Sequence, residues 1–259
     1  AIGDGIQIGY CAGTGGGWST ELIAHKSQIH EVPEDISDEG AVILEPAAGG
    51  VHTALKAQIQ PGDVVAVQGS GTMGLCSIAA IRKFTDAGTV IASAKYPLQR
   101  SLAEEFGADI VVEPSELKRA VRQVTGCRMI GNSLSGGSNV TIDAVGSASS
   151  IETSLEITRP RGRLVMLGMP GVTKVDLTPL WHREIEMVGS YTYGTESLPD
   201  GSITNSYALA FELVREMQLD KLVTDLYPLD RYKQAIRHAA EAGSLGAIKV
   251  AFDLRGEKR

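Results

Sequence analysis

The sequence has few cysteines, no long run of apolar residues and no excess of basic residues. Its 3 cysteines, Cys11, Cys76 and Cys127, lie far apart and form no C-x-x-C pair, so a structural zinc site cannot be built from this sequence. An odd, sparse set of this kind is typical of reduced thiols, and we expect a cytoplasmic protein. No stretch reaches the ~18 apolar residues of a membrane span, and the first residues carry no signal-peptide pattern, so no membrane partner is expected.

Acidic residues outnumber basic ones, 31 to 24, and the formal net charge at pH 7 is −7. A nucleic acid or an acidic membrane surface attracts a basic face, so we expect neither as a partner. Hydrophobic residues make up 43% of the 259 positions and charged residues 21%. That composition indicates a folded chain of one large or two smaller domains and argues against disorder.

From residue 63 onward, continuous apolar stretches alternate with amphipathic stretches of helical length. Strands are predicted over 64–69, 89–94, 109–113, 139–146 and 162–170. Helices are predicted between them, over 72–87, 97–107, 115–126 and 150–160. Buried strands that alternate with helices are typical of a parallel sheet covered on both faces. The sequence therefore predicts an α/β fold with a doubly wound parallel sheet of the Rossmann type.

The flanking segments follow a different pattern. Residues 1–40 contain short strand-like runs between glycine clusters, as in a small β barrel or its remnant. Pro33 and Ser37 are stop and cap signals, and a helix is predicted over 47–59. After residue 189 the alternation weakens. Two further helices are predicted there, over 206–219 and 231–243, and a last strand over 247–254.

The stretch "VVAVQGSGTMG" places Gly69, Gly71 and Gly74 in the spacing G-x-G-x-x-G, between a predicted strand and a predicted helix. In a dinucleotide site the first glycine allows a tight turn, the second lets the backbone approach a pyrophosphate, and the third lets the helix pack on the strand. The helix start then presents N–H groups and a positive dipole end to the phosphates. The alternative interpretation is a glycine turn selected for packing alone.

A site for NAD usually has an acid about 20 residues beyond the glycines, which binds the ribose hydroxyls. Here the second predicted strand ends at Ala94, and the cations Lys95 and Arg100 follow it with no acid nearby. A missing carboxylate removes repulsion of a 2′-phosphate, and nearby cations attract it. The pattern favours NADP and leaves NAD possible. The alternative is that both cations are ordinary solvated charges.

Several stretches together resemble the medium-chain dehydrogenase/reductase superfamily of zinc-type alcohol dehydrogenases, in its threonine/sorbitol dehydrogenase-like branch. They cover nearly the whole chain and are residues 13–55, which include the pair Glu45-Pro46, "VQGSGTMG", "LAEEFGAD", "DAVGS", "RPRGRLVMLGMPG" and "GAIKVAFDL". The resemblance implies three parts: the remnant of a GroES-like catalytic domain over 1–48, a Rossmann NAD(P)-binding domain over 49–190, and a return segment over 191–259. It also implies hydride transfer between a nicotinamide cofactor and an alcohol or polyol, or its carbonyl.

The resemblance also implies roles for individual residues. Thr72 and Met73 belong to the cofactor turn, and Val145 lies beside the cofactor. Leu167, Gly168 and Met169 line its nicotinamide end. Lys249 matches a basic position that contacts the pyrophosphate, although a lysine on an edge strand that faces water is the alternative. Residues 172–180 resemble an edge strand through which two nucleotide-binding domains pair, so a homodimer or homotetramer is implied.

Glu45 matches a position that, in polyol- and threonine-type members of the superfamily, is a ligand or near-ligand of the catalytic zinc. Its alternative role is that of a helix-start acid favoured by the helix dipole. The histidines, His25, His30, His52, His182 and His238, show no obvious ligand spacing, and we expect His52 to serve in packing or to face solvent. The superfamily's His-Glu pair and four-cysteine lobe are absent. We therefore expect that the N-terminal part of the catalytic domain is missing, and that zinc belongs to the full-length parent rather than to this chain alone.

Two alternatives to the zinc-type dehydrogenase stay open. The chain could be a catalytically inactive, truncated module that binds a nucleotide or mediates dimerisation. It could also resemble the zinc-free quinone or enoyl reductases of the same superfamily, although those members usually lack the acid of Glu45-Pro46. The substrate itself is not identified beyond a small alcohol or carbonyl compound.

Overall fold

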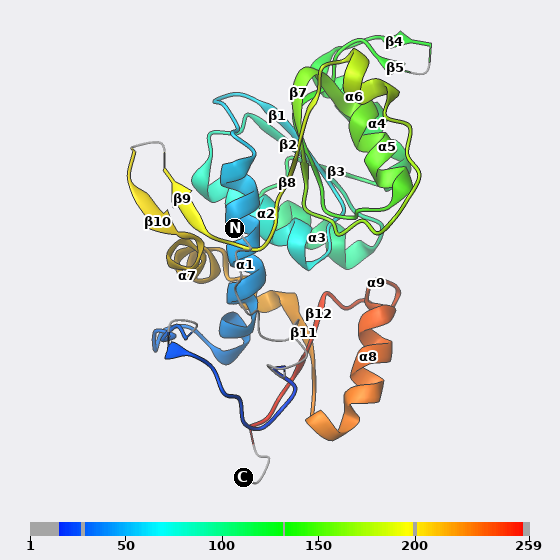
Figure 1. Cartoon of the computed structure of the whole chain (residues 1–259). Helices are drawn as coiled ribbons and strands as arrows, with labels where there is room; N and C mark the ends of the chain where they lie inside the picture. Colours follow the sequence, from blue (N-terminus) through cyan, green and yellow to red (C-terminus); the bar gives the residue numbers. More distant parts are fainter. Residues whose placement is uncertain (1–15, 27–28, 132, 199–200, 256–259) are drawn as a thin grey trace.

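The computed structural model describes residues 16–26, 29–131, 133–198 and 201–255 (Figure 1). A parallel sheet with helices on both faces forms one part. The C-terminal strands and helices form a second part together with the N-terminal segment, and the long helix α1 runs between the two parts. Among the described residues, no helix is both long enough and apolar enough to cross a membrane.

The main sheet has six strands in the order β3-β2-β1-β6-β7-β8, and all its pairs are parallel. The strands are β1 (Val64–Gln68), β2 (Thr89–Ser93), β3 (Ile110–Val112), β6 (Ser138–Asp143), β7 (Thr158–Met166) and β8 (Glu186–Gly189). This order reverses direction between β1 and β6, which is the doubly wound arrangement. The prediction of a Rossmann-type α/β fold is therefore confirmed.

Helices cover the two faces of this sheet. α2 (Thr72–Phe84) and α3 (Pro97–Glu105) lie on one face, and α4 (Leu117–Thr125) and α5 (Ala148–Ile157) lie on the other. The strands alternate accordingly. Val65 and Val67 are buried against the first helical layer, whereas Ala66 is buried against α4.

Helix α1 (Asp38–Lys56) begins where Ser37 caps it, because the Ser37 hydroxyl accepts a hydrogen bond from Gly40 N at 3.0 Å. The helix predicted over 47–59 therefore begins earlier than expected and runs through Pro46. Proline lacks an N–H, so one intrahelical hydrogen bond is missing there. Burial of the surrounding residues against α2 and α7 stabilises the helix in spite of this loss.

The remaining elements flank the sheet. They are the hairpin β4 (Met129–Ile130) and β5 (Ser133–Leu134), α6 (Thr178–His182), the hairpin β9 (Thr195–Ser197) and β10 (Ile203–Asn205), α7 (Ser206–Met217), β11 (Val223–Tyr227), α8 (Tyr232–Ala240), α9 (Ala242–Leu245) and β12 (Lys249–Phe252), with short 3-10 turns at Pro114–Glu116, Leu219–Leu222 and Leu229–Arg231. β11 and β12 form a separate parallel pair.

Two regions expected to contain strands form none in the described part of the chain. Residues 172–180 pair with no other described strand of this chain, Thr178–His182 form the short helix α6 with Pro179 in its first turn, and β8 is the edge strand of the sheet. Pairing of residues 172–180 with a second copy of the chain stays a prediction. The strand-like runs expected in residues 1–40 are also not seen over 16–26 and 29–37. A strand needs a neighbouring strand for its backbone hydrogen bonds, and no described strand pairs with these two segments. Residues 1–15 lie outside the described part.

The contact between α1 and α2 generates a stability prediction. A Cβ at position 50 would lie 2.7 Å from the backbone carbon of Cys76 and 2.8 Å from its carbonyl oxygen. Overpacking of this kind costs about 1–3 kcal/mol, more than the ~1 kcal/mol that alanine gains over glycine in a helix. We expect Gly50→Ala to lower the free energy of unfolding measured in urea. Gly171→Ala is the control, because nothing lies within 4 Å of its Cβ. Equal stability of the two variants would contradict the packing argument.

Candidate dinucleotide site at the carboxyl edge of the sheet

The three glycines of the G-x-G-x-x-G stretch meet different surroundings. Gly69 has φ +91°, and a Cβ there would lie 2.5 Å from Val145 Cγ2. A Cβ on Gly74 would fall on the carbonyl oxygen of Gly69. Nothing lies within 4 Å of a Cβ on Gly71. Packing within the protein therefore explains two of the glycines, and the third faces open space.

The first turn of α2 is available to an anion. Gly71 is its N-cap, with no side-chain capping bond and no acid in the first turn. The start of β12 lies beside this turn, since Thr72 Oγ1 donates to Ile248 O at 3.3 Å. Burial raises the pKa of the Cys76 thiol to about 12, and the positive charge of Lys249 partly opposes that rise. Lys249 therefore lies within electrostatic reach of α2.

Asp143, at the end of β6, connects the turn that follows β6 to the turn that follows β7. Its buried carboxylate accepts hydrogen bonds from Val145 N at 2.8 Å, Gly146 N at 3.0 Å and Ser150 Oγ at 2.9 Å. Its backbone carbonyl accepts two more, from Leu167 N at 2.9 Å and Gly168 N at 2.7 Å. A single residue thus fixes the turns that follow β6 and β7, and it satisfies its buried polar atoms in doing so.

The residues assigned to the nicotinamide end are consequently brought together. A Cβ on Gly146 would lie 2.9 Å from the backbone carbon of Gly168, so the two turns touch. Val145 is 49% exposed and Met169 is 86% exposed, whereas Leu167 is buried. The exposed side chains border the same edge of the sheet as Gly71. Whether they contact a cofactor stays a prediction.

The end of β2 adjoins the glycine turn through Ser93. Gly69 N donates to Ser93 Oγ at 3.1 Å, and Ser70 Oγ donates to the Ser93 carbonyl at 3.0 Å. The two predicted cations beyond β2 differ. Lys95 is exposed, with its ammonium 5.4 Å from the centre of the Tyr96 ring. Arg100 forms an ion pair with Glu113, which follows β3. Lys95 is therefore the cation better placed for an incoming phosphate.

A buried network that the sequence analysis missed lies next to this edge. Glu196 on β9 is 5% exposed, and its Oε1 lies 2.8 Å from His52 Nδ1 on α1. Ser206 Oγ donates to the same oxygen at 2.5 Å. Burial raises the pKa of Glu196, but the hydrogen bonds from His52 and Ser206 together lower it below its usual value. His52, predicted to pack or to face solvent, holds a buried carboxylate instead.

The described residues do not form a zinc site. No group of three or more His, Cys, Asp or Glu side chains among them could hold a metal ion. Glu45 lies exposed on α1, and its negative charge contributes to the raised pKa of Tyr207, after burial and the hydrogen bond that Tyr207 donates to Tyr193. Its predicted role as a ligand therefore needs companion ligands from outside the described residues.

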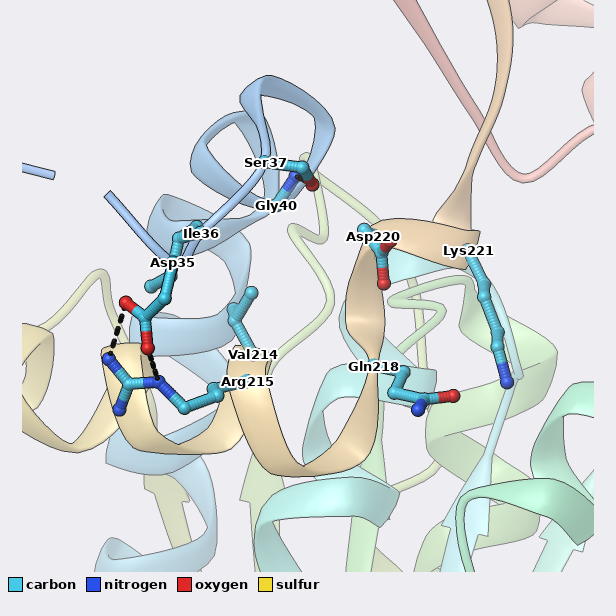
Figure 2. Close-up of a pocket in the computed structure, with 9 residues that line it drawn as sticks. All are labelled: Asp35, Ile36, Ser37, Gly40, Val214, Arg215, Gln218, Asp220 and Lys221. Atoms are coloured by element: carbon cyan, nitrogen blue, oxygen red, sulfur yellow. Dashed lines mark hydrogen bonds and ion pairs between the residues drawn. The ribbon is translucent and has the colours of Figure 1, made fainter. Parts of the chain in front are cut away.

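A cavity of about 430 Å³ lies away from the glycine turn, between the start of α1 and the end of α7 (Figure 2). Asp35 and Arg215 form an ion pair at its wall, with N–O distances of 2.6 and 3.1 Å. Gln218, Asp220 and Lys221 line another part of it. It contains none of the predicted site residues, and its charges of both signs do not favour one kind of ligand.

Comparison with known families now identifies the chain's relatives. The family described as zinc-binding dehydrogenase matches residues 72–206. The chain belongs to this family, which confirms the resemblance to the zinc-type alcohol dehydrogenases of the medium-chain superfamily. Sorbitol dehydrogenase of Bacillus subtilis (strain 168) is 27% identical over 216 residues, which is 81% of this chain and 56% of that protein. The chain thus spans little more than half the length of this relative.

Solved structures show the same fold. 2R,3R-butanediol dehydrogenase from Bacillus subtilis superimposes with a TM-score of 0.74 at 23% identity, covering 92% of this chain and 64% of that one. A putative zinc-binding dehydrogenase from Sinorhizobium meliloti 1021, solved bound to NADP, gives a TM-score of 0.71 at 24% identity, covering 92% and 66% of the two chains.

The lowered pKa of Glu196 generates a prediction about pH. A carboxyl whose pKa is depressed in the folded state stabilises the fold above its unfolded pKa, near 4.5, and loses that contribution as the pH falls through the folded value. We expect Glu196→Gln to lower the unfolding free energy by about 1–3 kcal/mol at pH ~7 and by less at pH ~3. Urea denaturation at both pH values measures this difference. A pH-independent difference would show that the charge of Glu196 does not contribute, and the neighbouring exposed variant Ser197→Ala should show no difference.

Proposed function

We propose that the chain is the nicotinamide-cofactor-binding part of a polyol or alcohol dehydrogenase. The observation that carries the proposal is the open space at Gly71, which adjoins an uncapped helix start and which packing of the protein does not explain. Membership of the zinc-binding dehydrogenase family and the similarity to a sorbitol dehydrogenase support the substrate class. The substrate would be a small alcohol or polyol, or the corresponding carbonyl compound.

In this proposal each part of the edge has its own role. The N–H groups of Thr72 and Met73 hold the pyrophosphate, and Lys249 supplies a positive charge beside them. Val145 and the stretch 167–169, fixed by Asp143, orient the nicotinamide ring. When bound, the cofactor supplies or accepts the hydride, and the protein contributes orientation and electrostatics.

We further propose NADP as the preferred cofactor. No acid follows β2, so nothing at this position repels a 2′-phosphate, and the exposed Lys95 attracts it. Arg100 contributes less, because Glu113 already neutralises it. The NADP-bound relative from Sinorhizobium meliloti is consistent with this choice.

The domain organisation belongs to the same proposal. Residues 49–190 would form the nucleotide-binding unit, and residues 1–48 and 191–259 would belong to the catalytic unit of the whole enzyme, which would be a homodimer or homotetramer. The described residues do not fit zinc on their own, and no step of the mechanism is assigned to it. Glu45 would be one ligand if the rest of the catalytic unit provided the others.

The variant Gly71→Ala distinguishes a dinucleotide site from a turn whose glycines serve packing alone. Its backbone has φ −78°, which alanine adopts without strain, and its Cβ would meet no protein atom. We expect the melting temperature to be unchanged and the affinity for NADPH, measured by calorimetry, to fall at least about tenfold because the methyl group takes space needed by the pyrophosphate. Gly74→Ala, in contrast, should lower the melting temperature. If the wild type binds no reduced cofactor, or Gly71→Ala binds it equally well, the proposed function is wrong.

Lys95→Ala tests the cofactor preference. Loss of a charge-assisted contact to a 2′-phosphate costs about 1.5–3 kcal/mol, so we expect the Kd for NADPH to rise roughly 10- to 100-fold while the Kd for NADH changes little. Lys233→Ala is the matched control, since Lys233 also lies over a tyrosine ring, that of Tyr232, but on α8. A parallel loss of affinity for both cofactors would assign Lys95 to a general role and would remove the argument for NADP.

A further inference from the structure

The loop 190–194 connects β8 to the hairpin β9–β10, and it is fixed at both ends. At its start, Ser190 N donates to Met166 O at 2.8 Å, and Ser190 Oγ lies 2.9 Å from Thr53 Oγ1 on α1. At its end, Gly194 N donates to Ser206 Oγ at 2.8 Å, and Ser206 N donates to Gly194 O at 3.0 Å. The loop therefore has little freedom while these anchors hold.

The middle of this loop lies against the same point of α1 as the cofactor turn. A Cβ on Gly49 would lie 2.8 Å from Met73 Cε and 3.5 Å from the carbonyl oxygen of Thr192. Met73 belongs to the first turn of α2, and the loop begins next to Met166, which precedes the turn at 167–169. The loop thus borders the edge where the nicotinamide end is proposed to lie, with Tyr191 and Tyr193 partly exposed.

The Glu196 latch, consisting of Glu196, His52 and Ser206, connects this loop to α1. Glu196 follows the loop on β9, and its single oxygen Oε1 takes hydrogen bonds from both partners, which come from α1 and α7. Because Ser206 and His52 both face the carboxylate rather than each other, the group does not have the nucleophile–base contact of a hydrolytic triad. Its geometry is that of a clamp between three elements.

We propose that Glu196 is a positioning residue, which holds the loop 190–194 in the place where it supports the nicotinamide ring. This inference rests on the proposed function. Glu196 itself contacts neither cofactor nor substrate and acts through the loop. Loss of the latch should therefore affect the nicotinamide half of the bound cofactor, whereas the adenosine and pyrophosphate half, bound at Gly71, Lys95 and Lys249, should be held as before.

The experiment measures two properties of bound reduced cofactor, NADPH or NADH, whichever the wild-type chain binds. Calorimetry gives the Kd, and the emission and anisotropy of the bound nicotinamide report how firmly the ring is held. For Glu196→Ala we expect the Kd to change by less than about threefold, while the enhanced nicotinamide emission is largely lost. Glu196→Gln, which keeps the shape and can still hydrogen-bond Ser206, should restore at least part of the emission. Ser197→Ala, on the same strand but exposed, should behave as wild type.

The outcomes are distinguishable. If the wild type binds no reduced cofactor, the proposed function fails, and the inference about Glu196 fails with it. If the wild type binds and Glu196→Ala gives unchanged emission, the positioning role alone is overturned. A loss of affinity in proportion to the loss of emission would also overturn it, because it would indicate a general structural role. If Glu196→Ala shows no cooperative melting transition, the variant His52→Ala is used instead, because it breaks the latch from the α1 side. The Kd and the nicotinamide emission of that variant then test the positioning role.

Discussion

The arrangement of the site depends on one buried residue, Asp143, at the carboxyl end of β6. Its carboxylate and its backbone carbonyl together fix the two turns that follow β6 and β7. A buried carboxylate is unfavourable unless its oxygens accept hydrogen bonds, so this residue and the donors around it are mutually dependent. The two turns touch at Gly146 and Gly168, where neither position has room for a side chain. Hydrogen bonds and close backbone packing therefore fix the two turns at the carboxyl ends of β6 and β7 relative to each other.

Three glycines that look equivalent in the sequence have different surroundings in the structure. Gly69 needs a positive φ and avoids Val145, and Gly74 allows α2 to approach the turn before it. Gly71 has neither constraint. The G-x-G-x-x-G spacing identifies all three glycines. Only the structure shows that folding requires Gly69 and Gly74, whereas the space at Gly71 is open to a ligand. This separation is what makes the dinucleotide interpretation testable with single methyl groups.

Much of the fold could be predicted from the sequence, because the signals involved are local. Apolar runs and amphipathic periods located the strands and helices of the sheet. Ser37 was recognised as a cap signal, and it does cap α1 through Gly40, but the helix was predicted to begin only at residue 47. The site was predicted less completely. His52 and Glu196 are 144 positions apart, and neither has neighbours in sequence that suggest a buried pair. Pairing of residues 172–180 across a dimer is a property of two copies, so a single chain does not test it, and within this chain Thr178–His182 form a short helix.

Helix α1 connects the functional parts of the molecule through a single turn. Gly49 and Gly50 let α2 and the loop 190–194 approach α1 closely. His52 forms a hydrogen bond with Glu196 of the hairpin, and Thr53 forms one with Ser190 at the start of the loop. Within this short stretch of α1, the two glycines therefore permit close packing, and the two residues that follow Val51 form hydrogen bonds. Because the first turn of α2 and the loop both pack against Gly49, a shift of α1 would move both together. The precise placement of the loop relative to the glycine turn is thus a property of α1, although α1 lies outside the sheet and precedes it in the chain.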